Sequence, residues 1–180
     1  MNAATTLALD LVATYGVAVL LVVFVLEGAL VGKLIPTRTL FVAVVLAAGS
    51  DAFAFLPVAA AAIVGATIGQ CVLFVSARRY DVDPAELTVV PVSEDRLDGA
   101  VGWFDRWGVP AVAVANALPG TRGWLAVPTA NADVSMSRFA AASLAGSTAY
   151  TGALVAVALG LERAVDGLLR ASAEGALPLA

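Results

Sequence analysis

The chain has 180 residues, of which 61% are hydrophobic and only 13% are charged. Soluble domains carry about 25% charged residues, so this composition predicts an integral membrane protein. Histidine is absent, which excludes histidine-based catalytic triads, histidine–metal sites and imidazole proton relays. Cys71 is the single cysteine, so no disulfide can form within the chain and a buried structural thiol is the simpler interpretation. We expect neither a cofactor nor a metal.

Acidic residues outnumber basic ones by 14 to 10, which gives a formal net charge of −4. The excess is concentrated between Asp81 and Arg106, in a stretch that we predict to be an extramembrane connector over residues 78–106. Such a run is most simply a solvated surface that keeps a protein hydrated in high salt, so the expected source is a salt-adapted archaeon. The same charge argues against a nucleic-acid partner, because an acidic segment repels phosphates.

The predicted first half of the chain covers residues 7–77 and begins with an apolar run over residues 7–26. This run lacks the basic start and the cleavage site of a signal peptide, so it indicates a retained membrane helix. A break near residues 27–48 follows, where Glu27, Pro36 and Arg38 interrupt the apolar pattern. Ionisable residues and a proline between apolar runs favour helix, break and helix over one straight crossing.

Residues 53–77 form the clearest predicted membrane span. Gly65 and Gly69 within it are four positions apart, a spacing that lets helices approach closely. Dimerisation and packing within the chain are equally open explanations for that spacing. Gln70 lies in the middle of the span and therefore needs a hydrogen-bond partner.

The connector is expected to contain a surface helix over residues 94–107, whose apolar side chains recur at helical spacing. Such a helix either lies along the membrane interface or packs onto the end of the helix bundle. The second predicted half, residues 107–161, ends in a full-length span over residues 139–161 that is rich in small residues and should pack tightly. Ser135 is the expected N-cap of that span. The remaining tail, residues 162–180, is too polar and too short to cross again.

The second half contains the most informative stretch, an apolar run broken near residues 116–124. A proline–glycine interruption at membrane depth is tolerated only inside protein or beside a wet cavity. An arginine at mid-membrane costs about 2.5 to 3.5 kcal/mol on insertion scales, so such residues usually mark a pathway or a binding site. Arg122 is therefore the first functional candidate, together with Asn116, Pro119 and Gly120.

The two halves share a layout. Tyr15-Gly16, an apolar run, Glu27 and Pro36-Thr37-Arg38 correspond to Trp107-Gly108, an apolar run, Asn116 and Pro119-Gly120-Thr121-Arg122. Broken segments at corresponding places predict a transporter built from inverted repeats, with its site near the midplane. The expected fold is an all-α, polytopic membrane protein with two re-entrant segments and a single membrane domain over residues 1–180.

These residues resemble the DedA family, also called the VTT-domain or SNARE-associated membrane family, over about residues 15–160. In that family an acid ends the first apolar run before a proline-containing break, and an Arg-x-x-Pro-x-x-Arg break follows later. Glu27 and Pro36 match the first pattern, and Pro119 and Arg122 match the second. Two positions depart from it, because Arg38 and Asn116 stand where the family commonly has an acid and an arginine. Both departures bear on proton coupling, for which the family is thought to use those residues.

The resemblance implies a multi-pass cell-membrane protein that moves phospholipids or polyprenyl-phosphate lipids between leaflets without nucleotide hydrolysis. Physical reasoning agrees, because helix ends at the breaks aim backbone N–H groups at the midplane and Arg122 adds a positive charge for an anionic headgroup. Glu27 would either carry a proton or pair with Arg122 as a gate. The candidate site comprises Glu27, Pro36, Arg38, Asn116, Pro119, Gly120 and Arg122.

Two other classes of function were weighed against transport. In a non-transporting scaffold or assembly protein, the broken segments would only pack helices together. An intramembrane enzyme is not expected, because Gly49-Ser50 and Gly146-Ser147 lack a nearby base. The expected partners are membrane lipids, with a homo-oligomer as a further possibility.

Overall fold

In the computed structural model, the described residues 16–29, 37–48, 52–80 and 94–175 form helices and turns, with no strand among them. The helices are α2 (Val17–Gly28), α3 (Thr37–Ala48), α4 (Ala52–Tyr80), α5 (Glu94–Trp107), α6 (Val109–Ala117), α7 (Ala126–Asn131) and α8 (Met136–Gly175). The expected all-α class is confirmed. Three predicted features lie at least partly outside the described residues. They are the start of the first apolar run up to residue 15, Pro36, and residues 81–93 of the predicted connector.

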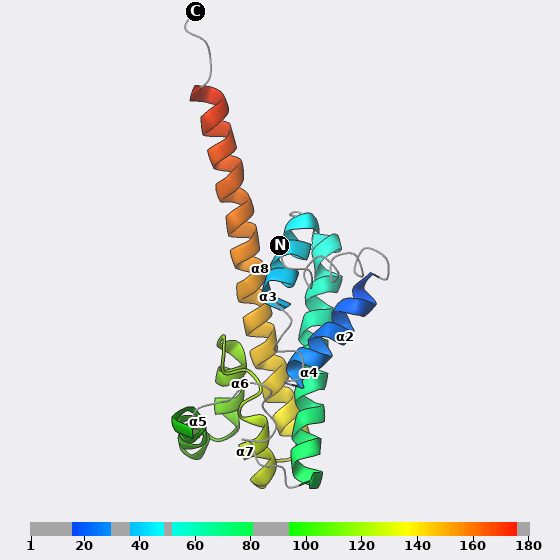
Figure 1. Cartoon of the computed structure of the whole chain (residues 1–180), viewed down its shortest axis with the longest axis vertical. Coiled ribbons are helices and arrows are strands. Elements are labelled where there is room, and N and C mark those ends of the chain that lie inside the picture. The colour runs from blue at the N-terminus through cyan, green and yellow to red at the C-terminus, as the bar shows by residue number, and fades with distance from the viewer. Residues whose placement is uncertain (1–15, 30–36, 49–51, 81–93, 176–180) are drawn as a thin grey trace, which may run out of the picture.

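Helices α4 and α8 form the antiparallel centre of the molecule (Figure 1). They contain the two apolar stretches long enough to cross a membrane, Phe55–Tyr80 and Met136–Ser172. At about 1.5 Å per residue, the first of these reaches about 39 Å, which exceeds the hydrocarbon thickness of about 30 Å. Helix α2 has 12 residues and is too short to cross alone. The predicted spans over residues 53–77 and 139–161 are thus confirmed as long apolar helices.

Helix α2 packs along α4 through the two glycines spaced four apart (Figure 1). A Cβ atom at Gly65 would lie 2.7 Å from the Leu21 carbonyl oxygen, and one at Gly69 would collide with the Val25 carbonyl oxygen. Only glycine permits this approach of the two backbones. Of the two explanations left open by the sequence, packing within the chain is therefore the one that the structure uses.

The remaining helices divide between the two ends of the α4–α8 pair. Helices α2 and α3 surround one end, and α6 and α7 surround the other (Figure 1). Each end has its own hydrophobic cluster: Phe24 and Phe41 meet edge to face in the first, with ring centroids 6.0 Å apart. Phe74 and Phe139 stack in the second, at 4.5 Å.

Helix α8 is longer than the sequence predicted. It begins just after Ser135, whose hydroxyl lies 3.5 Å from the backbone nitrogen of Arg138 in the expected capping position. The predicted span over residues 139–161 lies within α8, which continues without interruption through the first part of the tail to Gly175. The added segment lacks proline and is rich in Ala, Leu, Glu and Arg, which are strong helix formers. It projects beyond the other helices (Figure 1).

The expected surface helix is present as α5, with the predicted bounds. Phe104 is half-buried against the core cluster, whereas Trp103 and Trp107 are 49% and 63% exposed. Helix α5 thus contacts the bundle along one edge and leaves two indole rings uncovered.

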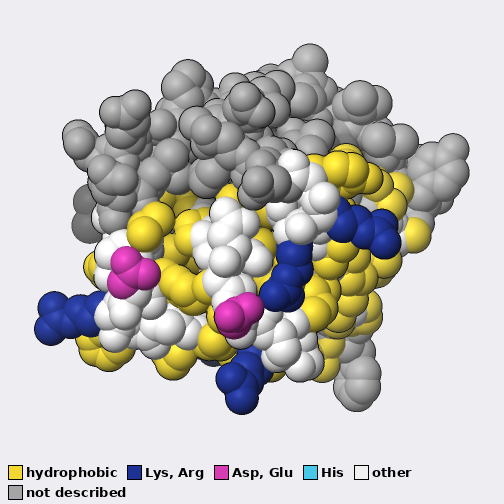
Figure 2. Space-filling model, turned by 90° about the horizontal axis from the view of Figure 1, so that it is seen from below, with side chains coloured by type: hydrophobic (Ala, Val, Ile, Leu, Met, Phe, Trp, Pro, Cys, Tyr) yellow, Lys and Arg dark blue, Asp and Glu magenta, His cyan; other side chains and the backbone are white. Residues whose placement is uncertain are grey.

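Charged side chains occur at the end of the molecule where α4 finishes and α8 begins. Arg78 donates a hydrogen bond to the Val134 carbonyl oxygen at 3.1 Å, which joins these two helix ends. Figure 2 views the molecule from this end and shows basic and acidic side chains among a largely hydrophobic surface. Arg79 and Arg138 are also exposed here.

Candidate functional site

The second predicted break is the turn over residues 118–125, between α6 and α7. A residue before proline is held out of helical conformation, and Leu118 has φ −99° and ψ 139° because Pro119 follows it. The Thr121 hydroxyl donates to the Ala115 carbonyl oxygen at 2.7 Å, which satisfies one of the free carbonyls at the end of α6. Gly120 takes φ +95°, a conformation that side chains disfavour. The break predicted near residues 116–124 is therefore explained by local chemistry.

Asn116 connects this turn to the two central helices. Its side chain is buried, and its amide nitrogen donates to Gln70 Oε1 at 2.9 Å and to Ser143 Oγ at 3.3 Å. Its amide oxygen accepts a hydrogen bond from the backbone N–H of Gly123 at 3.0 Å. The partner that Gln70 was expected to need is thus Asn116. One amide fixes α4, α8 and the turn relative to one another.

The turn directs Arg122 toward α8 and α2. Its Nη1 lies 3.6 Å from Glu27 Oε1, and its Nη2 donates to Ser147 Oγ at 3.4 Å. Its guanidinium carbon lies 4.2 Å from the centre of the Tyr150 ring, within the range of a cation–π contact. The Arg122 and Glu27 side chains are only 11% and 19% exposed. The structure therefore brings the acid that ends α2 against the arginine of the second break.

This group retains unused hydrogen-bonding capacity. Glu27 Oε2, Arg122 Nε and the Tyr150 hydroxyl are buried without a hydrogen-bond partner among the described residues. An unsatisfied buried polar group costs about 1–3 kcal/mol, and more when it is charged. Water or an anionic group could therefore be accommodated here with a gain in hydrogen bonding.

Helix α8 contributes a polar stripe that the sequence reasoning did not identify as part of the site. Ser143, Ser147, Tyr150 and Thr151 are all buried and lie toward one face of the helix, because Ser143, Ser147 and Thr151 are spaced four apart and Tyr150 follows Ser147 by three. Gly146 lies beside them, and a Cβ there would be 2.6 Å from the Asn116 Cβ. The sequence feature that indicates this stripe is the abundance of small polar residues in an otherwise apolar span.

The other predicted site residues lie elsewhere. Arg38 is exposed on the first turn of α3 and is not part of the buried group around Arg122. Pro119 and Gly120 are exposed and shape the turn. Pro36 lies outside the described residues.

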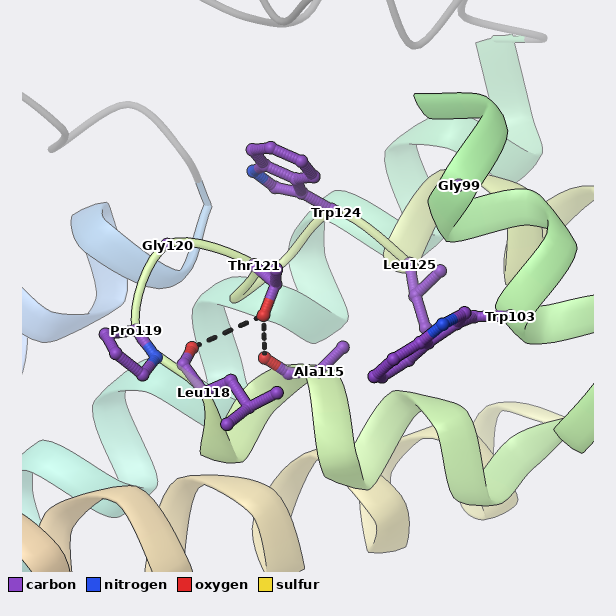
Figure 3. A pocket seen from close by; sticks show the side chains of 9 residues that line it. All are labelled: Gly99, Trp103, Ala115, Leu118, Pro119, Gly120, Thr121, Trp124 and Leu125. Atoms are coloured by element: carbon purple, nitrogen blue, oxygen red, sulfur yellow. Dashed lines mark hydrogen bonds between the residues drawn. The ribbon is translucent and has the colours of Figure 1, made fainter. Parts of the chain in front are cut away.

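A pocket of about 480 Å³ lies between α5 and the outer side of the turn (Figure 3). Trp103 and Leu125 form part of its wall, and the Thr121 hydroxyl hydrogen-bonds to the backbone of Ala115 (Figure 3). Its full lining is Gly99, Trp103, Ala115, Leu118, Pro119, Gly120, Thr121, Trp124 and Leu125.

A family model described as the VTT domain matches residues 35–160 of the chain. No curated protein and no solved structure shows a significant match. The matched range contains the second break, Arg122 and the polar stripe of α8, and it begins after Glu27.

Proposed function

The chain belongs to the VTT-domain family, the DedA or SNARE-associated membrane proteins, and we propose that it moves a lipid with a phosphate-containing headgroup between the leaflets of the cell membrane. Membership of this family and the two long apolar helices make it a membrane protein of broadly transporter-like type. The observation that carries the finer proposal is the contact between Arg122 and Glu27 in the interior.

A guanidinium binds phosphate well because its planar N–H groups match two phosphate oxygens. Arg122 is held at 3.6 Å from Glu27 and 3.4 Å from Ser147, both long for charge-assisted or hydroxyl contacts. A headgroup phosphate can therefore compete with Glu27 for Arg122 and gain shorter bonds. Exchange of Glu27 for phosphate at Arg122, and back again, would break and re-form the contact between Arg122 and Glu27. Proton uptake by the displaced Glu27 is one way to couple this exchange to an ion gradient.

The packing of the helices supports an inverted repeat as the framework for this exchange. Helix α2 contacts α4 and α6 contacts α8, so each short helix lies on the long helix of its own half. Helices α3 and α7 contact the long helix of the opposite half, α8 and α4 respectively. Such crossed contacts are expected when two broken segments meet at the interface between repeats.

The test is transbilayer movement of a fluorescent phospholipid in proteoliposomes at matched reconstitution. We expect wild-type protein to exceed empty liposomes and Arg122→Ala and Glu27→Gln to slow movement at least about tenfold, equivalent to about 1.4 kcal/mol in the barrier. Arg163→Ala is the matched control, because Arg163 is exposed on α8. Flux that is unchanged in Arg122→Ala would contradict the proposed site.

The scaffold alternative is favoured by one observation, the Asn116 network, whose hydrogen bonds connect α6 to α4, to α8 and to the turn. It predicts that wild-type protein is no faster than empty liposomes across several headgroups and pH values. It also predicts that the Arg122→Ala variant folds as wild type does and still binds any protein that wild type binds. The flux measurement therefore separates the two functions.

A further inference from the structure

A groove runs between α5 and α6 on the outer side of the second break. The pocket of about 480 Å³ described above lies on one side of Trp103, and a second pocket of about 520 Å³ lies on its other side. The second pocket is lined by Gly102, Trp103, Arg106, Trp107, Pro110, Ala111 and Val114. Trp103 lines both pockets, so the two adjoin at this residue, and together they are called the α5–α6 groove.

The chemistry of the α5–α6 groove changes along its length. At the turn end the lining is apolar, and its one hydroxyl, that of Thr121, is already hydrogen-bonded to the Ala115 carbonyl (Figure 3). At the other end Arg106 is exposed between two tryptophans. Arginine and tryptophan together are typical of the headgroup level of a membrane, where an indole ring has one apolar side and one polar group. The neighbouring Asp105 is exposed but does not line the pocket, so the charged group at this end of the groove is the Arg106 guanidinium, which is complementary to an anionic head.

We propose that the α5–α6 groove binds one membrane phospholipid, with an acyl chain beside Trp103 and Leu125 and the phosphate against Arg106. This site differs from the proposed transport site, because the Arg122 side chain reaches α2 and α8, away from α5. Binding here does not depend on transport. It would hold a lipid of the surrounding leaflet beside the break and fix α5 at the membrane interface.

Two glycines of α5 create the room for this lipid. A Cβ at Gly99 or Gly102 would meet no atom within 4 Å, so both positions border open space. Glycine is among the least favourable residues inside a helix, so leucine at these positions favours the helix itself. Leucine at both positions should therefore fill the groove while leaving α5 intact, which separates loss of binding from loss of folding.

The chain provides its own reporter, because its three tryptophans, Trp103, Trp107 and Trp124, all line the groove. The experiment titrates phosphatidylglycerol with mid-chain bromine into the full chain in detergent and follows quenching of tryptophan fluorescence. We expect saturable quenching at one lipid per chain. The double variant Gly99→Leu/Gly102→Leu should weaken binding at least about tenfold, or about 1.4 kcal/mol. Arg106→Gln should weaken it as well.

Matched controls are Gly160→Leu, at an open position of α8, and Arg163→Gln, at an exposed arginine. Both should bind like wild type, and circular dichroism checks the helix content of every variant. Quenching that does not saturate, or that is unchanged in the double variant, would overturn the proposal. A dimer that dissociates in the double variant without lipid quenching would assign the groove to a second copy and overturn it too. Retained quenching without lipid flux would contradict the transport proposal alone.

Discussion

Replacing Asn116 by alanine should destabilise the protein strongly, because this one amide makes three buried hydrogen bonds to Gln70, Ser143 and Gly123. Hydrogen bonds between membrane helices contribute about 0.6 kcal/mol on average and up to about 1.7 kcal/mol. The substitution also leaves the Gly123 N–H and the Gln70 amide buried without this partner, and each such group costs about 1–3 kcal/mol. Two such groups give an expected loss of about 2–6 kcal/mol in the free energy of unfolding.

The assay is titration of purified protein from a mild into a denaturing detergent, followed by tryptophan fluorescence. Asn131→Ala is the matched control, because Asn131 is exposed at the end of α7. Its loss should stay below about 0.5 kcal/mol, as for most surface substitutions. The argument that Asn116 organises the break would be refuted if the two variants unfolded at the same detergent fraction.

Three further predictions concern the packing of short helices on the long ones and the contact between Arg122 and Tyr150. Gly146→Val should lose about 1–3 kcal/mol in the same titration, because a side chain there overlaps the backbone of α6, whereas Gly152→Val at an open position should change stability by less than about 0.5 kcal/mol. Gly69→Val should also destabilise the protein by about 1–3 kcal/mol without altering the oligomeric state in light scattering, since this glycine packs on α2. Tyr150→Leu should lose about 0.5–2 kcal/mol through the missing cation–π contact, while Tyr150→Phe keeps the ring and should resemble wild type. Equal losses of stability in the two Tyr150 variants would contradict a stabilising cation–π contact.

The features that could be predicted from the sequence depend on residues close together in the chain. The two long helices follow from uninterrupted apolar composition, and the end of α6 follows from Pro119, which holds Leu118 extended. The bounds of α5 follow from apolar residues at helical spacing. The need of Gln70 for a partner was also evident, because burying an amide in an apolar span without a hydrogen bond costs free energy, and Asn116 satisfies its oxygen.

The composition of the site was only partly predictable, because side chains from distant segments form it. Glu27 and Arg122 were each candidates, but the distance between them depends on the tertiary structure. Ser147 and Tyr150 were not identified, because serine and tyrosine in a small-residue helix carry no signal of which neighbour they face. Arg38 was included by analogy with the family pattern and is exposed on α3 instead.

By itself, the sequence determined that this is an all-α membrane protein with two long apolar helices and a break at Pro119, because hydropathy and backbone sterics act locally. Only the tertiary structure decided that Gly65 and Gly69 pack on α2. It alone placed the acid of α2 against Arg122, because that meeting depends on how two long helices orient the segments they carry.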